Sequence, residues 1–365
     1  MPKIRKFDLG LFAVCLLGFS QPILAQTSLS IDEARLLAEN GNNDAKLALG
    51  LAYQTGQGVA QDYSLAIDWY EKAAKAGSID AKVRLGGLLA EGLGAQKDLG
   101  AAFKLFESAA ASDHPDATLI LGTMYEKGLG TEKSIERAME LYEHAAALGV
   151  AEAATNIGVI YQMDDLEQQD FEQAIAWYQR GAEMGDVRAV NNLGVMYLRG
   201  EGFEKNPEQA AKLFQIAVNQ GSTEAMNNLA SLYDSALGVP LDEARAEELF
   251  RMAAKGQRDQ RTAAGLPNAQ EIFNFVSAPK FDRKGLTAAA KSGDQKAQYI
   301  LGHLHMNGWG TPQDYVTAYA WLNLATATSG ETIVRDTLTK RMTASQINAG
   351  QALARDLGKS ISAGE

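Results

Sequence analysis

The sequence predicts an all-α fold, an α-solenoid in which antiparallel helix pairs stack along the chain. The first observation is an alanine that recurs every 36 residues and returns in the same phase after a gap of two steps. Its positions are Ala45, Ala81, Ala117, Ala153, Ala189, Ala225 and Ala297. The second observation is that two residue pairs recur with the same 36-residue spacing. One is a Leu-Gly pair, such as Leu49-Gly50, and the other is an aromatic or apolar pair, such as Trp69-Tyr70. Such a period indicates units that contact mainly their neighbours.

The N-terminus predicts a secretory signal peptide over residues 1–25. Basic residues precede an apolar run over residues 9–19, and the small residue Ala25 follows. The run is shorter than the roughly 20 apolar residues that cross a membrane, so an uncleaved anchor is the weaker alternative. We expect cleavage near Ala25, a periplasmic or secreted protein, and no membrane insertion after cleavage. The only cysteine, Cys15, lies in this segment, which excludes disulfides from the mature chain.

The next residues predict a cap helix over 26–42 and six repeats over 43–256, which we number 1 to 6. In repeat 1, apolar residues at helical spacing predict two helices joined by the Gly56-x-Gly58 turn, since glycine tolerates positive φ. One position precedes each second helix and carries Asp62, Asp98, Ser134, Asp170, Asn206, Asp242 or Asp314. Because serine and asparagine replace aspartate, we interpret this position as a helix N-cap rather than a catalytic acid.

The C-terminal third departs from the regular pattern before returning to it. Residues 257–293 lose the motif but keep its phase, which predicts a degenerate repeat or a linker containing Pro267 and Pro279. Residues 294–330 predict one final repeat. Residues 331–365 predict a C-terminal cap helix and tail, which a solenoid needs to shield its last apolar face.

The motifs A-x3-L-G-x2-Y, G-x-G-V-x2-D and W-Y-x-K-A-A-x2-G, read from residues 45–77, resemble those of the Sel1-like repeat family, which is related to tetratricopeptide repeats. The resemblance covers about residues 30 to 330. It implies a right-handed superhelix of antiparallel helix pairs whose concave surface binds proteins. Many bacterial relatives are secreted or periplasmic, in agreement with the predicted signal peptide.

Charge and composition argue against several classes of function. The chain has 34 basic and 45 acidic residues, a net charge of −11, and this balance disfavours nucleic acid and anionic membranes as partners. The four histidines show no metal-ligand spacing, so we expect neither metal nor cofactor. Ser277 and Lys280 form an S-x-x-K motif, but the chain has no Lys-Thr-Gly partner for it, which argues against an acyl-transfer enzyme.

The strongest binding candidate is a periodic set of amide side chains. Asn156, Asn192 and Asn228 lie one repeat apart in successive first helices, and Asn191 and Asn227 precede the last two. Amides both donate and accept, which suits the N–H and C=O groups of an extended peptide. The alternative is that these asparagines only bridge adjacent helices.

Two further segments are candidate contact surfaces. The turn over residues 163–170 replaces both glycines with Asp164 and Leu166, and is either a contact loop or a variant turn. The segment 257–286 is mildly basic and carries three phenylalanines, so it is either a docking surface or a degenerate repeat that buries them.

We therefore predict a non-enzymatic protein- or peptide-binding scaffold of the bacterial envelope that holds its ligand on the concave face. One alternative is a regulator of an envelope sensor kinase or an exopolysaccharide apparatus. Another is a hydrolase that acts on the cell wall or on β-lactams. The identity of the protein or peptide partner is not encoded in these patterns.

Overall fold

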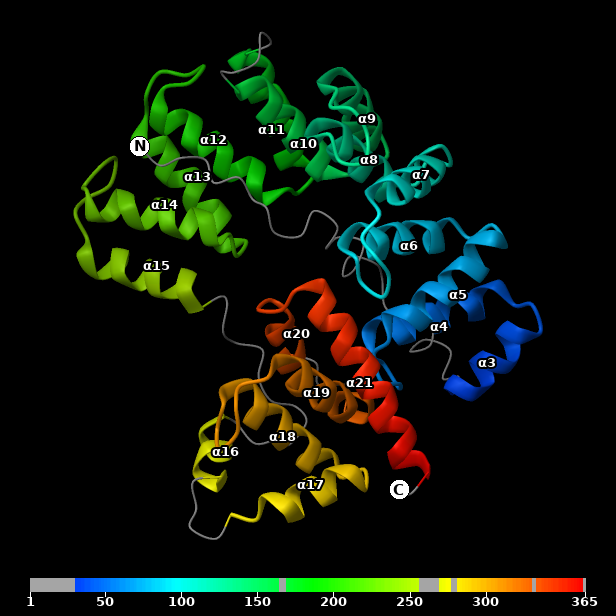
Figure 1. Ribbon diagram of the computed structural model, residues 1–365. Helices are drawn as coiled ribbons and strands as arrows, with labels where there is room; N and C mark the ends of the chain where they lie inside the picture. The colour runs from blue at the N-terminus through cyan, green and yellow to red at the C-terminus, as the bar shows by residue number, and fades with distance from the viewer. Residues whose placement is uncertain (1–29, 164–168, 256–268, 277–280, 330–332, 364–365) are drawn as a thin grey trace. The chain divides into compact units, whose positions relative to one another are not determined.

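The computed structural model describes residues 30–163, 169–255, 269–276, 281–329 and 333–363, and all regular structure within these ranges is α-helical (Figure 1). The predicted signal peptide, the S-x-x-K residues and the variant turn residues 164–166 lie outside the described residues. The helices are α3 (Ile31–Glu39), α4 (Asn43–Thr55), α5 (Tyr63–Lys75), α6 (Ile79–Glu91), α7 (Leu99–Ala110), α8 (Pro115–Lys127), α9 (Ile135–Ala147), α10 (Ala151–Gln162), α11 (Phe171–Glu183), α12 (Val187–Arg199), α13 (Pro207–Asn219), α14 (Thr223–Asp234), α15 (Glu243–Lys255), α16 (Ala269–Val276), α17 (Arg283–Lys291), α18 (Gln295–Asn307), α19 (Tyr315–Ser329), α20 (Ile333–Thr339) and α21 (Ala344–Ala363).

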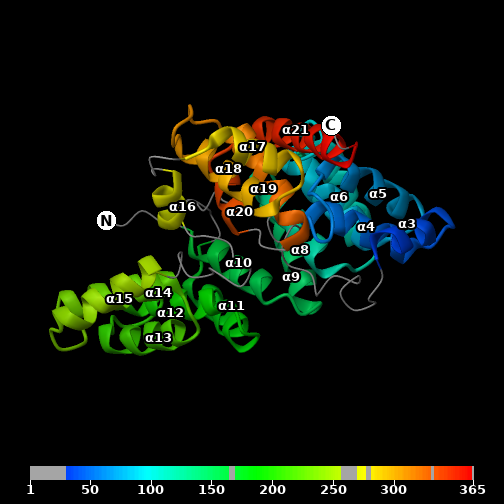
Figure 2. The ribbon, with the colours of Figure 1, turned by 90° about the horizontal axis from the view of Figure 1, so that it is seen from below.

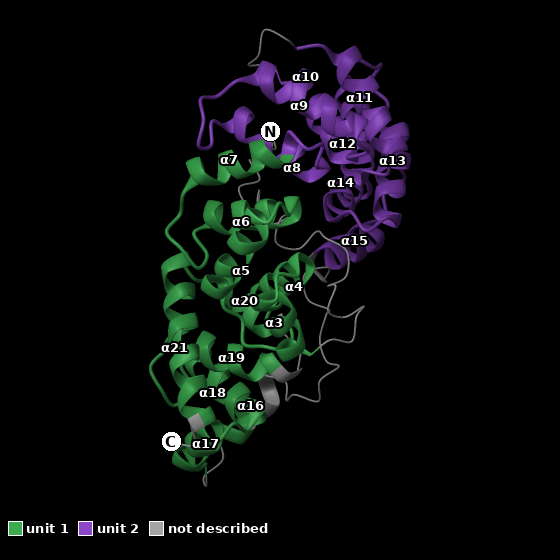
Figure 3. Ribbon diagram, turned by 90° about the vertical axis from the view of Figure 1, so that its right-hand side faces the viewer, with its two compact units in different colours: residues 1–109, 261–365 green, residues 110–260 purple. Residues whose placement is uncertain are grey.

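The helices divide into two compact units, which Figure 3 colours separately. Unit 2, residues 110–260, contains repeats 3 to 6; the two helices of each repeat pack together, and each second helix packs on the first helix of the next repeat. Unit 1 contains residues 1–109 together with residues 261–365. The first two repeats therefore share a unit with the C-terminal helices, although the whole of unit 2 lies between them in sequence.

The predicted N-caps of the second helices are all confirmed. Each of the seven side chains accepts a hydrogen bond from a first-turn backbone amide, at donor–acceptor distances between 2.8 and 3.2 Å. Most first helices are capped as well, which the sequence pattern did not lead us to expect. The capping side chains belong to Asn42, Ser78, His114, Asp186, Ser222 and Asp294. A cap of this kind contributes about 1 kcal/mol to helix stability.

In repeats 1 to 5 and in the final repeat, a second-helix ring or apolar side chain packs on the glycine of the Leu-Gly or Ile-Gly pair. A Cβ atom built on Gly158 would lie 2.6 Å from the ring of Tyr178, and one on Gly194 would lie 2.6 Å from that of Phe214. The same relation links Gly50 with Tyr70 and Gly122 with Tyr142. Real side-chain carbons do not approach so closely, so glycine at this position is what allows the two helices to pack.

Repeat 6 departs from this arrangement. Ala230 replaces the glycine, and Phe250, at the position of the packed ring, is 42% exposed. Ala230 itself is fully buried, and Leu249, the residue before Phe250, packs in the core of this unit. In addition, α15 is the last helix of unit 2, so no following first helix within that unit covers Phe250.

Replacing the glycine of a regular repeat should therefore destabilise the protein. We expect Gly158→Ala to lower the free energy of unfolding by about 1–3 kcal/mol, because the methyl group overlaps the Tyr178 ring. Gly100→Ala is the matched control, since its Cβ would meet only Asp98 Oδ1 at 3.5 Å within helix α7. Helix propensity should make that control more stable by about 0.5–1 kcal/mol. Urea unfolding of the two variants checks this, and equal destabilisation would contradict the packing argument.

The final repeat contains a histidine where repeat 1 has Tyr53, and this substitution should make its stability depend on pH. Burial and the nearby Arg283 guanidinium lower the pKa of His305, with Asp314 opposing them. Its Nδ1 atom is buried without a hydrogen-bond partner. The folded chain therefore binds this proton less readily than the unfolded chain, in which the pKa is about 6.5.

We expect the stability contributed by neutral His305 to be complete above about pH 6.5 and to be lost as the pH falls through the lower pKa of the folded state. The His305→Tyr variant restores the residue type of repeat 1 and removes this titration. The difference in unfolding free energy between wild type and variant, measured from pH 8 down to about pH 5, isolates the effect from other titrating groups. A difference that stays constant with pH would show that His305 does not contribute.

Candidate functional site

The predicted asparagines lie on the first helices α10, α12 and α14 of repeats 4 to 6. Asn191 is 4% exposed, whereas Asn156, Asn192 and Asn228 are each half-buried and Asn227 is exposed. Asn191 and Asn227 occupy the same position one repeat apart, yet the first is buried and the second is exposed. The half-buried members, Asn156, Asn192 and Asn228, occupy the same position in three successive repeats.

Two of these asparagines bridge consecutive first helices. Asn228 Nδ2 on α14 donates to Asn191 Oδ1 on α12 at 2.9 Å. Between α10 and α12 a different pair makes the link, because Thr155 Oγ1 donates to Asp186 Oδ2 at 2.6 Å. The bridging alternative therefore holds for Asn191 and Asn228, while a role in peptide binding stays a prediction.

Asn192 belongs to a second polar network, built around the tyrosine ring that packs on Gly158. Asn192 lies beside the Tyr178 hydroxyl; burial raises the pKa of that hydroxyl well above its ordinary value, and the Asn192 amide opposes the rise. Tyr178 donates to Gln162 Oε1 at 2.7 Å, and Gln162 Nε2 donates to Glu201 at 2.6 Å. This network fixes the side chains at the ends of α10 and α12, close to the predicted binding amides.

The sequence contained a signal for this network that the repeat analysis did not use. Where the second helix carries tyrosine, the residue 16 positions earlier is polar: Gln54 precedes Tyr70, and Glu126 precedes Tyr142. In repeats 2 and 5, where the buried ring has no hydroxyl, that residue is apolar: Ala90 precedes Phe106, and Leu198 precedes Phe214. In repeat 6 the residue 16 positions before the exposed Phe250 is Asp234. The pairing follows from the cost of burying a hydroxyl without a partner.

Three of the four histidines contact neighbouring residues of the repeats. His114 Nδ1 accepts from the Ala117 amide at 3.3 Å, and His144 Nε2 lies 3.0 Å from Asp113 on an exposed surface. His303 is buried beside Tyr299. Within the described ranges no group of three or more His, Cys, Asp or Glu residues could hold a metal ion.

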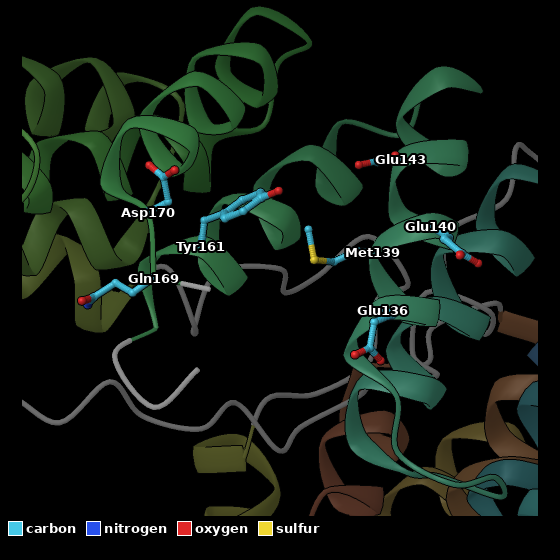
Figure 4. A pocket seen from close by; sticks show the side chains of 7 residues that line it. All are labelled: Glu136, Met139, Glu140, Glu143, Tyr161, Gln169 and Asp170. Carbon is cyan, nitrogen blue, oxygen red and sulfur yellow. The ribbon is translucent and has the colours of Figure 1, made fainter. Parts of the chain in front are cut away.

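An open depression lies beside α9 and the end of α10 in unit 2 (Figure 4). It is lined by Glu136, Met139, Glu140, Glu143, Tyr161, Gln169 and Asp170. Glu140 is paired with Arg137 at 2.7 Å, and Glu136 accepts from Ser134. The carboxylates make this surface acidic, which disfavours anionic ligands. Figure 4 shows that the lining side chains come from separate segments of the unit.

Of the remaining candidates, the basic segment over 257–286 lies only partly within the described residues. Its helix α16 has Phe273 and Phe275 on the exposed side, while Ile272 is buried. Phe273 contacts Trp309 edge to face at 5.3 Å, and Phe275 contacts Phe281 at 5.6 Å. No helix in the described part of the chain is long and apolar enough to cross a membrane.

Comparison with known proteins agrees with this architecture. The family model of the Sel1 repeat matches more than half of the chain, over residues 43–78, 79–114, 115–150, 151–186, 187–222, 223–257 and 295–327. Among curated proteins, none matches significantly.

Two solved structures illustrate the likeness. The first is c5321, a protective antigen present in uropathogenic Escherichia coli strains that displays an SLR fold; it is 27% identical, with a TM-score of 0.53 over 91% of this chain and 73% of that one. The second is a Sel1 repeat protein from Oxalobacter formigenes, also 27% identical, with a TM-score of 0.58 over 63% of this chain and 93% of that one. The repeat match and these folds together show that the chain belongs to the Sel1-repeat family of α-solenoid proteins.

Proposed function

We propose that this protein is a non-enzymatic scaffold of the bacterial envelope that binds a protein or extended peptide through the first helices of repeats 4 to 6. The observation that carries the proposal is the set of half-buried amides at Asn156, Asn192 and Asn228, one on each successive first helix. An extended peptide repeats its N–H and C=O groups along its length, and a row of amides can satisfy both. The predicted signal peptide supports the envelope location.

The hydrogen bonds in this region support a preorganised site. The side-chain Nδ2 of Asn228 donates to Asn191 Oδ1. The side-chain Oδ1 of Asn228 takes no part in this bond. Asn192 lies beside the Tyr178 hydroxyl, which is itself fixed by its hydrogen bond to Gln162. Groups fixed before binding lose less conformational entropy when a ligand arrives. The stacking of α10, α12 and α14 supplies the spacing between amides.

The experiment compares capture of envelope proteins by the mature chain and by the double variant Asn192→Ala/Asn228→Ala. We expect the variant to bind the captured partner at least about tenfold more weakly, because each lost hydrogen bond contributes about 0.5–1.5 kcal/mol. Thermal unfolding should show that the variant stays folded. The affinity is then measured with the purified partner.

Asn191→Ala is the matched control. It breaks the bridge to Asn228 but removes a side chain that is too buried to touch a ligand. We expect this control to lose about 1 kcal/mol of stability and to keep its partner. Equal loss of binding in the control and the double variant would show that the asparagines act only by bridging helices, and unchanged affinity in the double variant would remove them from the binding site.

A further inference from the structure

The C-terminal helices of unit 1 contact the first two repeats at the turns between their helices. Figures 1 and 2 both show α21 alongside the helices of these repeats. The contact includes two short backbone segments, residues 61–63 in repeat 1 and residues 92–94 in repeat 2. The carbonyl of Thr55 in repeat 1 also accepts from Arg335 at 3.3 Å. These turns lie more than 250 residues from their partners in sequence.

Asn323 on α19 binds both backbone groups of one residue. Its Oδ1 accepts from the Gln61 amide at 2.9 Å, and its Nδ2 donates to the Gln61 carbonyl at 2.7 Å. Asn323 is fully buried, and its amide replaces the water that would otherwise satisfy this backbone. The side chain of Gln61 is held as well, because it accepts from the Tyr319 hydroxyl.

Asn348 on α21 makes the same kind of paired contact with repeat 2. Its Oδ1 accepts from the Gly94 amide at 2.8 Å, and its Nδ2 donates to the Gly92 carbonyl at 3.0 Å. One turn along the helix, Gln351 Oε1 accepts from the Tyr63 amide at 3.1 Å. Two amides of α21 therefore bind the main chain of consecutive repeats.

An ion pair also joins α21 to repeat 1. Arg355 Nη1 on α21 lies 2.6 Å from Asp62 Oδ2, and Asp62 is itself the N-cap of α5. The aspartate is almost fully buried and the arginine is about one-third exposed. We call Asn323, Asn348, Gln351 and Arg355 the C-terminal clamp.

The other repeats show that this contact is specific to the start of the array. The residue before the second-helix N-cap is 5% exposed in repeat 1, where it is Gln61. Its counterparts are exposed in every other repeat: Lys97, Lys133, Gln169, Lys205, Leu241 and Gln313. The turn of repeat 1 is thus buried by the clamp and not by the repeat fold.

Apolar packing accompanies the polar contacts. One continuous core joins residues of the first two repeats, such as Tyr53 and Leu88, with Tyr319, Leu322 and Ile347 from the C-terminal helices. Breaking the contact would expose apolar surface as well as unpaired backbone, so the two ends of the chain should open together.

We propose that the C-terminal helices α19–α21 are a self-recognition surface whose partner is the turn side of repeats 1 and 2 in the same chain. The clamp makes the two ends of the array a single cooperative unit. It also withholds the turns at 61–63 and 92–94 from any external partner. The C-terminal segment therefore does more than cap the final repeat, because it also closes the start of the array.

Amide hydrogen exchange on the full chain, read at single residues by mass spectrometry, tests this proposal. In Asn348→Ala we expect exchange at Gly94 to rise at least about tenfold, and exchange at Gln61 and Tyr63 to rise with it, although Asn348 bonds neither. Asn307→Ala is the matched control, because its amide bonds only the His303 carbonyl within α18. It should leave all three rates unchanged.

Three results would overturn the proposal. A rise confined to Gly94 would mean separate local contacts, and no rise at all would mean that the clamp does not hold the turns. Protection of these amides that falls on dilution would place the contact between two copies of the chain. If Asn348→Ala does not fold, Arg355→Ala, which removes a partly exposed side chain, is measured at the same amides with the same expected coupled rise.

Discussion

The closest approach between the two helices of a repeat is the contact of a ring or apolar side chain with a glycine, and the rest of the array depends on it. Because Gly158 has no side chain, the Tyr178 ring packs directly against the backbone of the first helix. The next repeat packs on that pair, so each such contact sets the position of its neighbour. Repeat 6, with Ala230, has its phenylalanine exposed instead.

The same contact determines where polar groups are placed. A tyrosine at the ring position carries its hydroxyl into the interior, where Gln54, Glu126 or Gln162 accepts a hydrogen bond. In repeat 4 this network extends through Gln162 to Glu201, and Asn192 lies beside its Tyr178 hydroxyl. Of the amides proposed to bind a ligand, Asn192 therefore neighbours a group that satisfies a buried hydroxyl, whereas Asn228 is bonded to Asn191.

Local features could be predicted from the sequence because their causes are local. An N-cap such as Ser134 acts within three residues, and the 36-residue phase repeats the same requirement in every copy. The Asn191–Asn228 bridge joins neighbouring repeats, and was anticipated only as an alternative. The clamp was not predicted, because Asn323 and Asn348 carry no pattern that names a partner more than 250 residues away. Gln61 gave no distinguishing signal either, because Gln169 and Gln313 occupy the same position in other repeats and are exposed.

A unit assembled from both ends of a chain has a consequence for the order in which it forms. Repeats 1 and 2 leave the ribosome first, but the partner of Gln61 is synthesised 262 residues later. Solenoids usually grow by adding each unit to its neighbour, a process that needs only short-range contacts. Here the last step is the docking of the C-terminal helices onto repeats 1 and 2. This step joins residues far apart in sequence, and the conformational entropy lost in closing so long a loop makes it slow. Until residues 323–355 have been added, the turns of the first two repeats stay in water, while repeats 3 to 6 can already be complete.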